Sequence, residues 1–146
     1  VLMSKIMDIG PADVGLLTKM LSVLYPHKTF GTELYKRAAK AVIAACETSP
    51  ADKITLHMGL KALGEASFEN MDNQNATNYL KSIEGNSFFS SVTGTGLVAL
   101  YNDHDVWKLL GYEGASYHLG GYVDRGFNDL DWLPEPRITE YEGASE

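Results

Sequence analysis

The chain has 146 residues, with 19 acidic and 12 basic side chains and a formal charge of −7. Residues 1–110 carry 11 acids and 10 bases, whereas residues 111–146 carry 8 acids and 2 bases, so the acidity belongs almost entirely to the last quarter. A nucleic-acid partner needs a basic face that releases counterions, and the charge argues against that class. The length fits one domain that can bury a real core.

The sequence also bears on the compartment and the cofactors. No apolar run approaches the roughly 18 residues of a transmembrane helix, and the start VLMSKIMDIG lacks the basic-then-apolar order of a secretory signal. The protein is therefore expected in the cytoplasm or, after removal of a leader, outside it. A single cysteine, Cys46, excludes an internal disulfide and a cysteine-built zinc or iron–sulfur site in this chain.

Residues 1–110 show the helical spacing of apolar residues and no period-2 strand. We therefore predict an all-α protein with five or six helices in one compact bundle. The expected helices cover residues 11–25, 32–47, 50–64, 72–84, 87–101 and 104–110.

Individual residues predict how these helices begin and pack. The second helix is expected to begin at a Thr32 cap. Its buried side is expected to be one of two stripes: Leu34, Ala38, Val42 and Cys46, or alternatively Ala41 and Ala45. The third resembles a capping box, with Ser49 as cap, then proline, then an acid.

The last two helices carry signals of their own. Gly94 and Gly96 each weaken a helix by roughly 1 kcal/mol relative to alanine, which favours a closely packed middle for residues 87–101. Asp103 is expected to cap the final helix and Gly111 to stop it.

Residues 111–146 are predicted to form a long irregular C-terminal arm of the same domain. Glycines and prolines interrupt every helix or strand there, yet the arm holds six of the 15 aromatic residues: Tyr112, Tyr117, Tyr122, Phe127, Trp132 and Tyr141. A disordered tail is normally poor in aromatics, so the arm is expected to pack, either on its own helices or on another protein.

No catalytic residue and no metal site is expected in this chain. The four histidines, at positions 27, 57, 104 and 118, have no metal-ligand spacing. Asp103-His104-Asp105 is typical of a helix start with acids in the first turn, and Cys46 is typical of a small buried thiol. The segment from Thr93 to Gly96 lacks the lysine of a phosphate-binding loop, and the acids of the arm lack the spacing of an EF-hand.

Several strings in the C-terminal half together resemble the gluconate 2-dehydrogenase subunit 3 family. They are Leu100-Tyr101-Asn102, Val106-Trp107-Lys108-Leu109-Leu110-Gly111-Tyr112-Glu113-Gly114, Gly120-Gly121-Tyr122, Arg125-Gly126-Phe127 and Asp131-Trp132-Leu133-Pro134. The resemblance spans roughly residues 20–137 and includes Leu24-Tyr25-Pro26-His27 and Phe88-Phe89. Ala115 and His118 stand where the family pattern has prolines, which leaves the substrate branch open.

The resemblance implies a non-catalytic accessory subunit. In that family a large FAD-containing subunit of the glucose–methanol–choline type holds the catalytic base and acts on gluconate, glucose, fructose or the 3-hydroxyl of glucosides. The small subunit supports its folding, stability and often export, and a cytochrome c or iron–sulfur component completes the electron path. This chain would bind no cofactor of its own. It would be periplasmic, although the twin-arginine leader of many members is not seen in it, and the cytoplasm is the alternative.

The arm is therefore the expected partner interface, formed by Tyr112, Tyr117, Tyr122, Arg125, Phe127, Asp131 and Trp132. Trp132 is the expected anchor, Trp107 is expected in the core, and Arg125 either bridges to the partner or forms a plain surface ion pair. The acidic arm predicts a basic groove on the large subunit. Two other classes stay open: a self-contained enzyme whose site includes His104 or His118 under the arm, and a homo-oligomeric structural protein.

Overall fold

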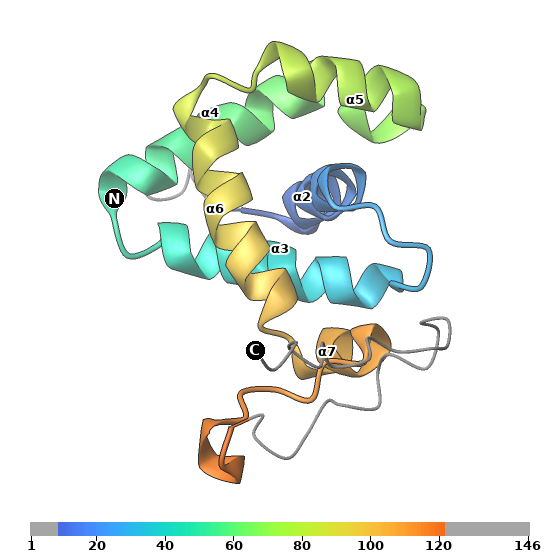
Figure 1. Ribbon diagram of the computed structural model, residues 1–146. Coiled ribbons are helices and arrows are strands. Elements are labelled where there is room, and N and C mark those ends of the chain that lie inside the picture. Colours follow the sequence, from blue (N-terminus) through green and yellow to red (C-terminus); the bar gives the residue numbers. More distant parts are fainter. Residues whose placement is uncertain (1–8, 122–146) are drawn as a thin grey trace, which may run out of the picture. The chain divides into compact units, whose positions relative to one another are not determined.

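The structure, a computed structural model, describes residues 9–121 and is all-α within them, as predicted (Figure 1). Its helices are α2 (Pro11–Leu24), α3 (Thr32–Cys46), α4 (Pro50–Glu65), α5 (Asn73–Ser82), α6 (Ser87–Tyr101) and α7 (His104–Leu110), with short 3₁₀ helices η1 (Phe68–Asn70) and η2 (Tyr117–Leu119). The chain divides into two units, Val1–Tyr112 and Glu113–Glu146. None of the helices within residues 9–121 combines the length and apolar character needed to cross a membrane.

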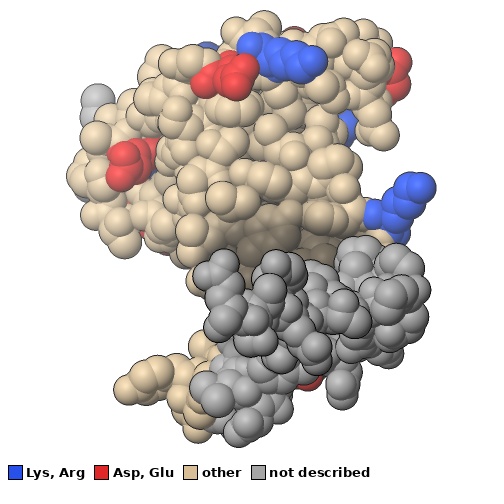
Figure 2. Space-filling model, viewed as in Figure 1, with Lys and Arg blue, Asp and Glu red and all other residues tan. Residues whose placement is uncertain are grey.

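The core of the first unit lies where α2, α3 and α6 meet. Helix α3 packs along α2 on one side and against α6 on another, and α4 contacts all three. The largest side chains removed completely from solvent are Phe68, Leu17, Met20, Leu21, Leu56, Leu60, Leu63, Leu100, Val42, Val92 and Val106. Helix α6 contains no charged residue, and Figure 2 shows a surface without lysine, arginine, aspartate or glutamate over it.

Two glycines allow α6 to lie unusually close to its neighbours. A Cβ atom on Gly59 of α4 would lie 2.1 Å from the ring of Phe88, and one on Gly96 would lie 2.5 Å from Cδ2 of Leu21. A side chain at either position would have to displace buried atoms. The closely packed middle expected for α6 is therefore found at Gly96 but not at Gly94, around which there is open space.

The helix starts match the expected caps with one exception. Ser49 accepts a hydrogen bond from the backbone N–H of Asp52, as the proposed cap requires. Helix α3, in contrast, is capped by Gly31 without a side-chain bond, so the prediction of a Thr32 cap was wrong. The buried side of α3 is the stripe with Leu34, Ala38, Val42 and Cys46. The alternative with Ala41 and Ala45 was wrong, since both are exposed.

Two short 3₁₀ helices were missed in the sequence. Just before η1, Ser67 adopts a left-handed conformation with φ of 54°, and the next residue, Phe68, is completely buried in the core. Lys19 of α2 donates hydrogen bonds to the carbonyls of Glu69 (2.8 Å) and Met71, so this turn is tied to α2. In the second unit, η2 shows that the glycines do not interrupt every helix after Gly111.

Candidate interaction site

Only two of the seven expected interface residues lie within the described part of the chain. Tyr112 ends the first unit with 49% of its surface exposed, and Tyr117 begins η2 of the second unit with 94% exposed. The other five, Tyr122, Arg125, Phe127, Asp131 and Trp132, lie outside the described residues. The candidate interaction site that can be built from the structure is therefore α7 with Tyr112.

Helix α7 has the local signals that the sequence indicated. The Asp103 side chain accepts a hydrogen bond from the backbone N–H of Asp105 at 2.9 Å, which caps the first turn. Gly111 ends the helix in a left-handed conformation, with φ of 73°. The interpretation of Asp103-His104-Asp105 as a helix start is thus confirmed.

A charged clamp attaches α7 to α3. The Arg37 guanidinium donates from Nε to Asp103 Oδ2 at 2.7 Å, and from Nη2 to Asp103 Oδ1 and Asp105 Oδ2, both at 2.9 Å. This fork–fork geometry orients both partners. The hydrogen bond from Arg37 lowers the pKa of Asp103, and the same bond raises the pKa of Arg37. No local sequence pattern indicates this pairing, because the partners are 66 and 68 positions apart.

Trp107 connects α7 to α6 and to Tyr112. Its indole Nε1 donates to the carbonyl of Tyr101 at 2.6 Å, and its ring lies 4.6 Å from that of His104. The ring of Tyr112 meets it edge-on at 5.3 Å, while the Tyr112 N–H donates to the Trp107 carbonyl at 2.8 Å. Trp107 is only half-buried, and Val106 is the buried residue of α7. Trp107 is not part of the apolar core, so the expectation that it is a core residue was wrong.

Leucines remain exposed on this well-anchored helix. Leu109 and Leu110 each expose 49% of their surface, as does Tyr112 just after them. These three residues lie within four positions of one another at the end of α7, and clustered exposed apolar side chains are typical of contact surfaces. We name Leu109, Leu110 and Tyr112 the α7 patch.

A tyrosine–histidine cluster holds the connection between α2 and α3 against α6. His27 Nε2 lies 2.6 Å from the hydroxyl of Tyr101, and the Tyr35 hydroxyl donates to the carbonyl of Tyr25 at 2.7 Å. Burial is the main cause that raises the pKa of both Tyr25 and Tyr35. No sequence pattern indicated this role of Tyr25 and His27, which the structure shows positioning the connection between α2 and α3.

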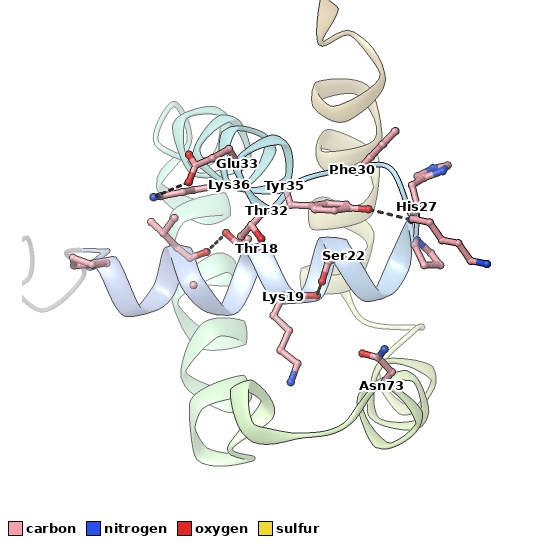
Figure 3. A pocket seen from close by; sticks show the side chains of 15 residues that line it. Thr18, Lys19, Ser22, His27, Phe30, Thr32, Glu33, Tyr35, Lys36 and Asn73 are labelled. Carbon is pink, nitrogen blue, oxygen red and sulfur yellow. Dashed lines mark hydrogen bonds and ion pairs between the residues drawn. The ribbon is translucent and has the colours of Figure 1, made fainter. Parts of the chain in front are cut away.

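An open groove of about 870 Å³ lies beside this cluster (Figure 3). It is lined by one side of α2, by the connection that follows it and by the first turns of α3. Two of its hydroxyl groups bond to their own helix: Thr18 donates to the Val14 carbonyl and Ser22 to the Lys19 carbonyl. We name this hollow the α2–α3 groove.

Nucleophiles and metal ligands do not gather in the described residues. Cys46 is a buried free thiol, as expected, with Ser91 Oγ 3.8 Å from its sulfur. Between residues 9 and 121, no three side chains of the His, Cys, Asp or Glu type are placed to share a metal ion.

Comparisons of the whole chain with protein-family models, with curated proteins and with solved structures gave no match.

Proposed function

We propose that this chain is the non-catalytic small subunit of an FAD-dependent sugar, glucoside or sugar-acid dehydrogenase, and that it stabilises the large flavoprotein subunit. The proposal is supported by the resemblance of residues 98–134 to the gluconate 2-dehydrogenase subunit 3 family. The structural observation that carries it is the α7 patch, which keeps apolar side chains in solvent on a helix fixed by the Arg37 clamp.

The physical reason lies in the cost of leaving apolar surface in water. Burial of apolar surface contributes roughly 25 cal/mol per Å², so two leucines and a tyrosine that are half exposed are available to stabilise a complex. A rigid support adds to this, because a patch that is already ordered loses little conformational entropy on binding. The charged clamp and both helix caps provide that rigidity.

In this proposal the partner supplies FAD and the chemistry, and this chain contributes no catalytic residue and no cofactor. A cytochrome c or iron–sulfur component would take up the electrons. The periplasm is the proposed compartment, with assistance in export as a further role, and the cytoplasm is the alternative.

The test is co-expression of the full chain with a flavoprotein of the glucose–methanol–choline type, to be sought first in the neighbouring genes. We expect equimolar co-purification with a flavin-bearing protein. Removal of residues 113–146, the whole second unit, should abolish it. Replacing both Leu109 and Leu110 by serine should weaken association by about ten-fold or more, equivalent to about 1.4 kcal/mol.

A matched control is available on α4. Ile54 and Met58 expose 48% and 66% of their surfaces, far along the chain from α7, and their replacement by serine should leave association unchanged. Equal association of all the variants would contradict the proposal. Turnover of a sugar by the isolated chain would favour the self-contained enzyme, and self-association without a flavoprotein would favour the homo-oligomer.

A further inference from the structure

We propose that the α2–α3 groove docks an extended acidic segment of the flavoprotein subunit. This is a second contact surface, built from other residues than the α7 patch, and the identity of its partner rests on the proposed function. The groove's charges, the directions of its lysine side chains and the apolar residues between them support this proposal.

Positive charge predominates around the groove. The ionised side chains that line it are Lys19, Lys28, Lys36 and Glu33, which leaves an excess of two positive charges. Glu33 and Lys36 pair with each other at 3.6 Å, with 76% and 46% of their side chains exposed, so the pairing is weak. The first turn of α3 adds the positive end of its helix dipole. A partner that covers this groove must therefore bring carboxylates rather than ammonium groups.

The positions of the cations favour a chain segment over a small anion. Figure 3 shows Lys36 directed toward Glu33 and Lys19 directed to another side of the groove. Lys19 is held there by the carbonyls of Glu69 and Met71. The ammonium groups of Lys19 and Lys36 therefore lie at separate places, which favours a ligand with several carboxylates over a single small anion. An extended segment rises about 3.3 Å per residue, and it can present successive carboxylates to separate cations.

The groove also accepts apolar side chains between these charges. Pro11, Val14, Pro26 and Phe30 contribute to its lining. Phe30 is fixed by stacking on His27, with ring centroids 4.2 Å apart. Since the hydroxyls of Thr18 and Ser22 already bond to their own helix, a docked segment does not have to satisfy them. Acidic residues alternating with apolar ones would suit both features of the surface.

The experiment measures the affinity of the purified flavoprotein for the full chain and for two charge-reversal variants. Lys28→Glu/Lys36→Glu changes the groove, whereas Lys61→Glu/Lys81→Glu makes the same change in net charge on α4 and α5, outside it. We expect the groove variant to bind about ten-fold more weakly and with a shallower dependence on salt, and the control variant to bind within about two-fold of the wild type.

Cross-linking supplies a readout that does not depend on the fold of a variant. Treatment of the wild-type complex with a zero-length carbodiimide should join Lys28 or Lys36 to aspartates or glutamates of the flavoprotein, as identified by mass spectrometry. If the wild type binds but the groove variant binds equally well and no such cross-link forms, the groove proposal fails while the proposed function stands. If the wild type does not bind the flavoprotein, both fail. If phosphate competes more strongly than sodium chloride does at equal ionic strength, the ligand of the groove is a small anion and not an acidic segment.

Discussion

Helices α6 and α7 follow one another directly in the chain, but different forces hold them. Helix α6 buries Phe88, Val92, Gly96 and Leu100 and contacts α2, α3 and α4. Helix α7 buries only Val106 and is held by a side-chain cap, a glycine stop and the bonds from Arg37. The first is positioned by apolar packing and the second mainly by polar groups.

The two helices also differ in what accompanies the apolar side chains that they expose. Helix α6 exposes two large apolar side chains, Leu97 and Val98, and α7 likewise exposes Leu109 and Leu110. Only α7 is followed closely by Tyr112, an expected interface residue that is itself 49% exposed. Because polar groups position α7, its two leucines can keep about half of their surface exposed. The same residue type therefore stabilises the fold in one helix and is available for binding in the next.

The largest effect should separate a leucine of α6 from one of α7. Leu100 is completely buried, so Leu100→Ala should lower the free energy of unfolding by about 2–5 kcal/mol through the cavity that it leaves. Leu110 is 49% exposed, so Leu110→Ala should change the free energy of unfolding by no more than about 0.5 kcal/mol. Chemical denaturation of the two variants measures both. Similar losses would show that α7 is packed as α6 is.

A smaller effect should distinguish two glycines within α6. Gly96→Ala places a methyl group against completely buried Leu21, and overpacking of about 1–3 kcal/mol should exceed the gain of about 1 kcal/mol in helix propensity. Gly94→Ala meets open space and should stabilise the protein by about 0.5–1 kcal/mol. Thermal unfolding of the pair is the measurement, and stabilisation by both substitutions would contradict the close approach.

The smallest effect should come from the charge of Asp103. Its pKa is lowered in the folded protein, so its carboxylate contributes stability above its ordinary pKa of 3.8, and this contribution is lost as pH falls through the folded value. Asp103→Asn keeps a capping side chain but removes the charge. The variant should therefore be less stable than the wild type near neutral pH, and the difference should shrink below about pH 4.

Hydrogen exchange of the α7 amides, compared with those of α6, shows whether the loss at neutral pH is confined to the clamped helix. An equal difference between Asp103→Asn and the wild type at all pH values would show that the bond to Arg37 contributes nothing through its charge.

Sequence patterns predicted most of the helices of the described chain, because each carries its own signal. The span Ser87–Tyr101 and the caps Ser49, Asp103 and Gly111 follow from residues within a few positions of one another. Errors arose where a signal was weak. Gly31 caps α3 without a side chain, and the left-handed Ser67 before Phe68 has no strong preference for that conformation.

For the candidate site, the sequence indicated Tyr112 as an interface residue but not what supports it. The Arg37 clamp and the contact between His27 and Tyr101 join residues 66 to 74 positions apart. The α2–α3 groove likewise combines residues from α2, α3 and the start of α5. No local pattern reports such pairs, because they depend on which helices become neighbours.

The sequence by itself determined the helical class, the position of most caps and the concentration of acid in residues 111–146. Those properties depend on composition and on short-range backbone chemistry. Only the tertiary structure decided which of two glycines lies in a close contact, which leucines remain exposed, and where lysines from different segments surround a groove. Such outcomes depend on how helices distant in the chain pack. The burial of a side chain and the charged groups around it are set by its neighbours and not by the residue alone.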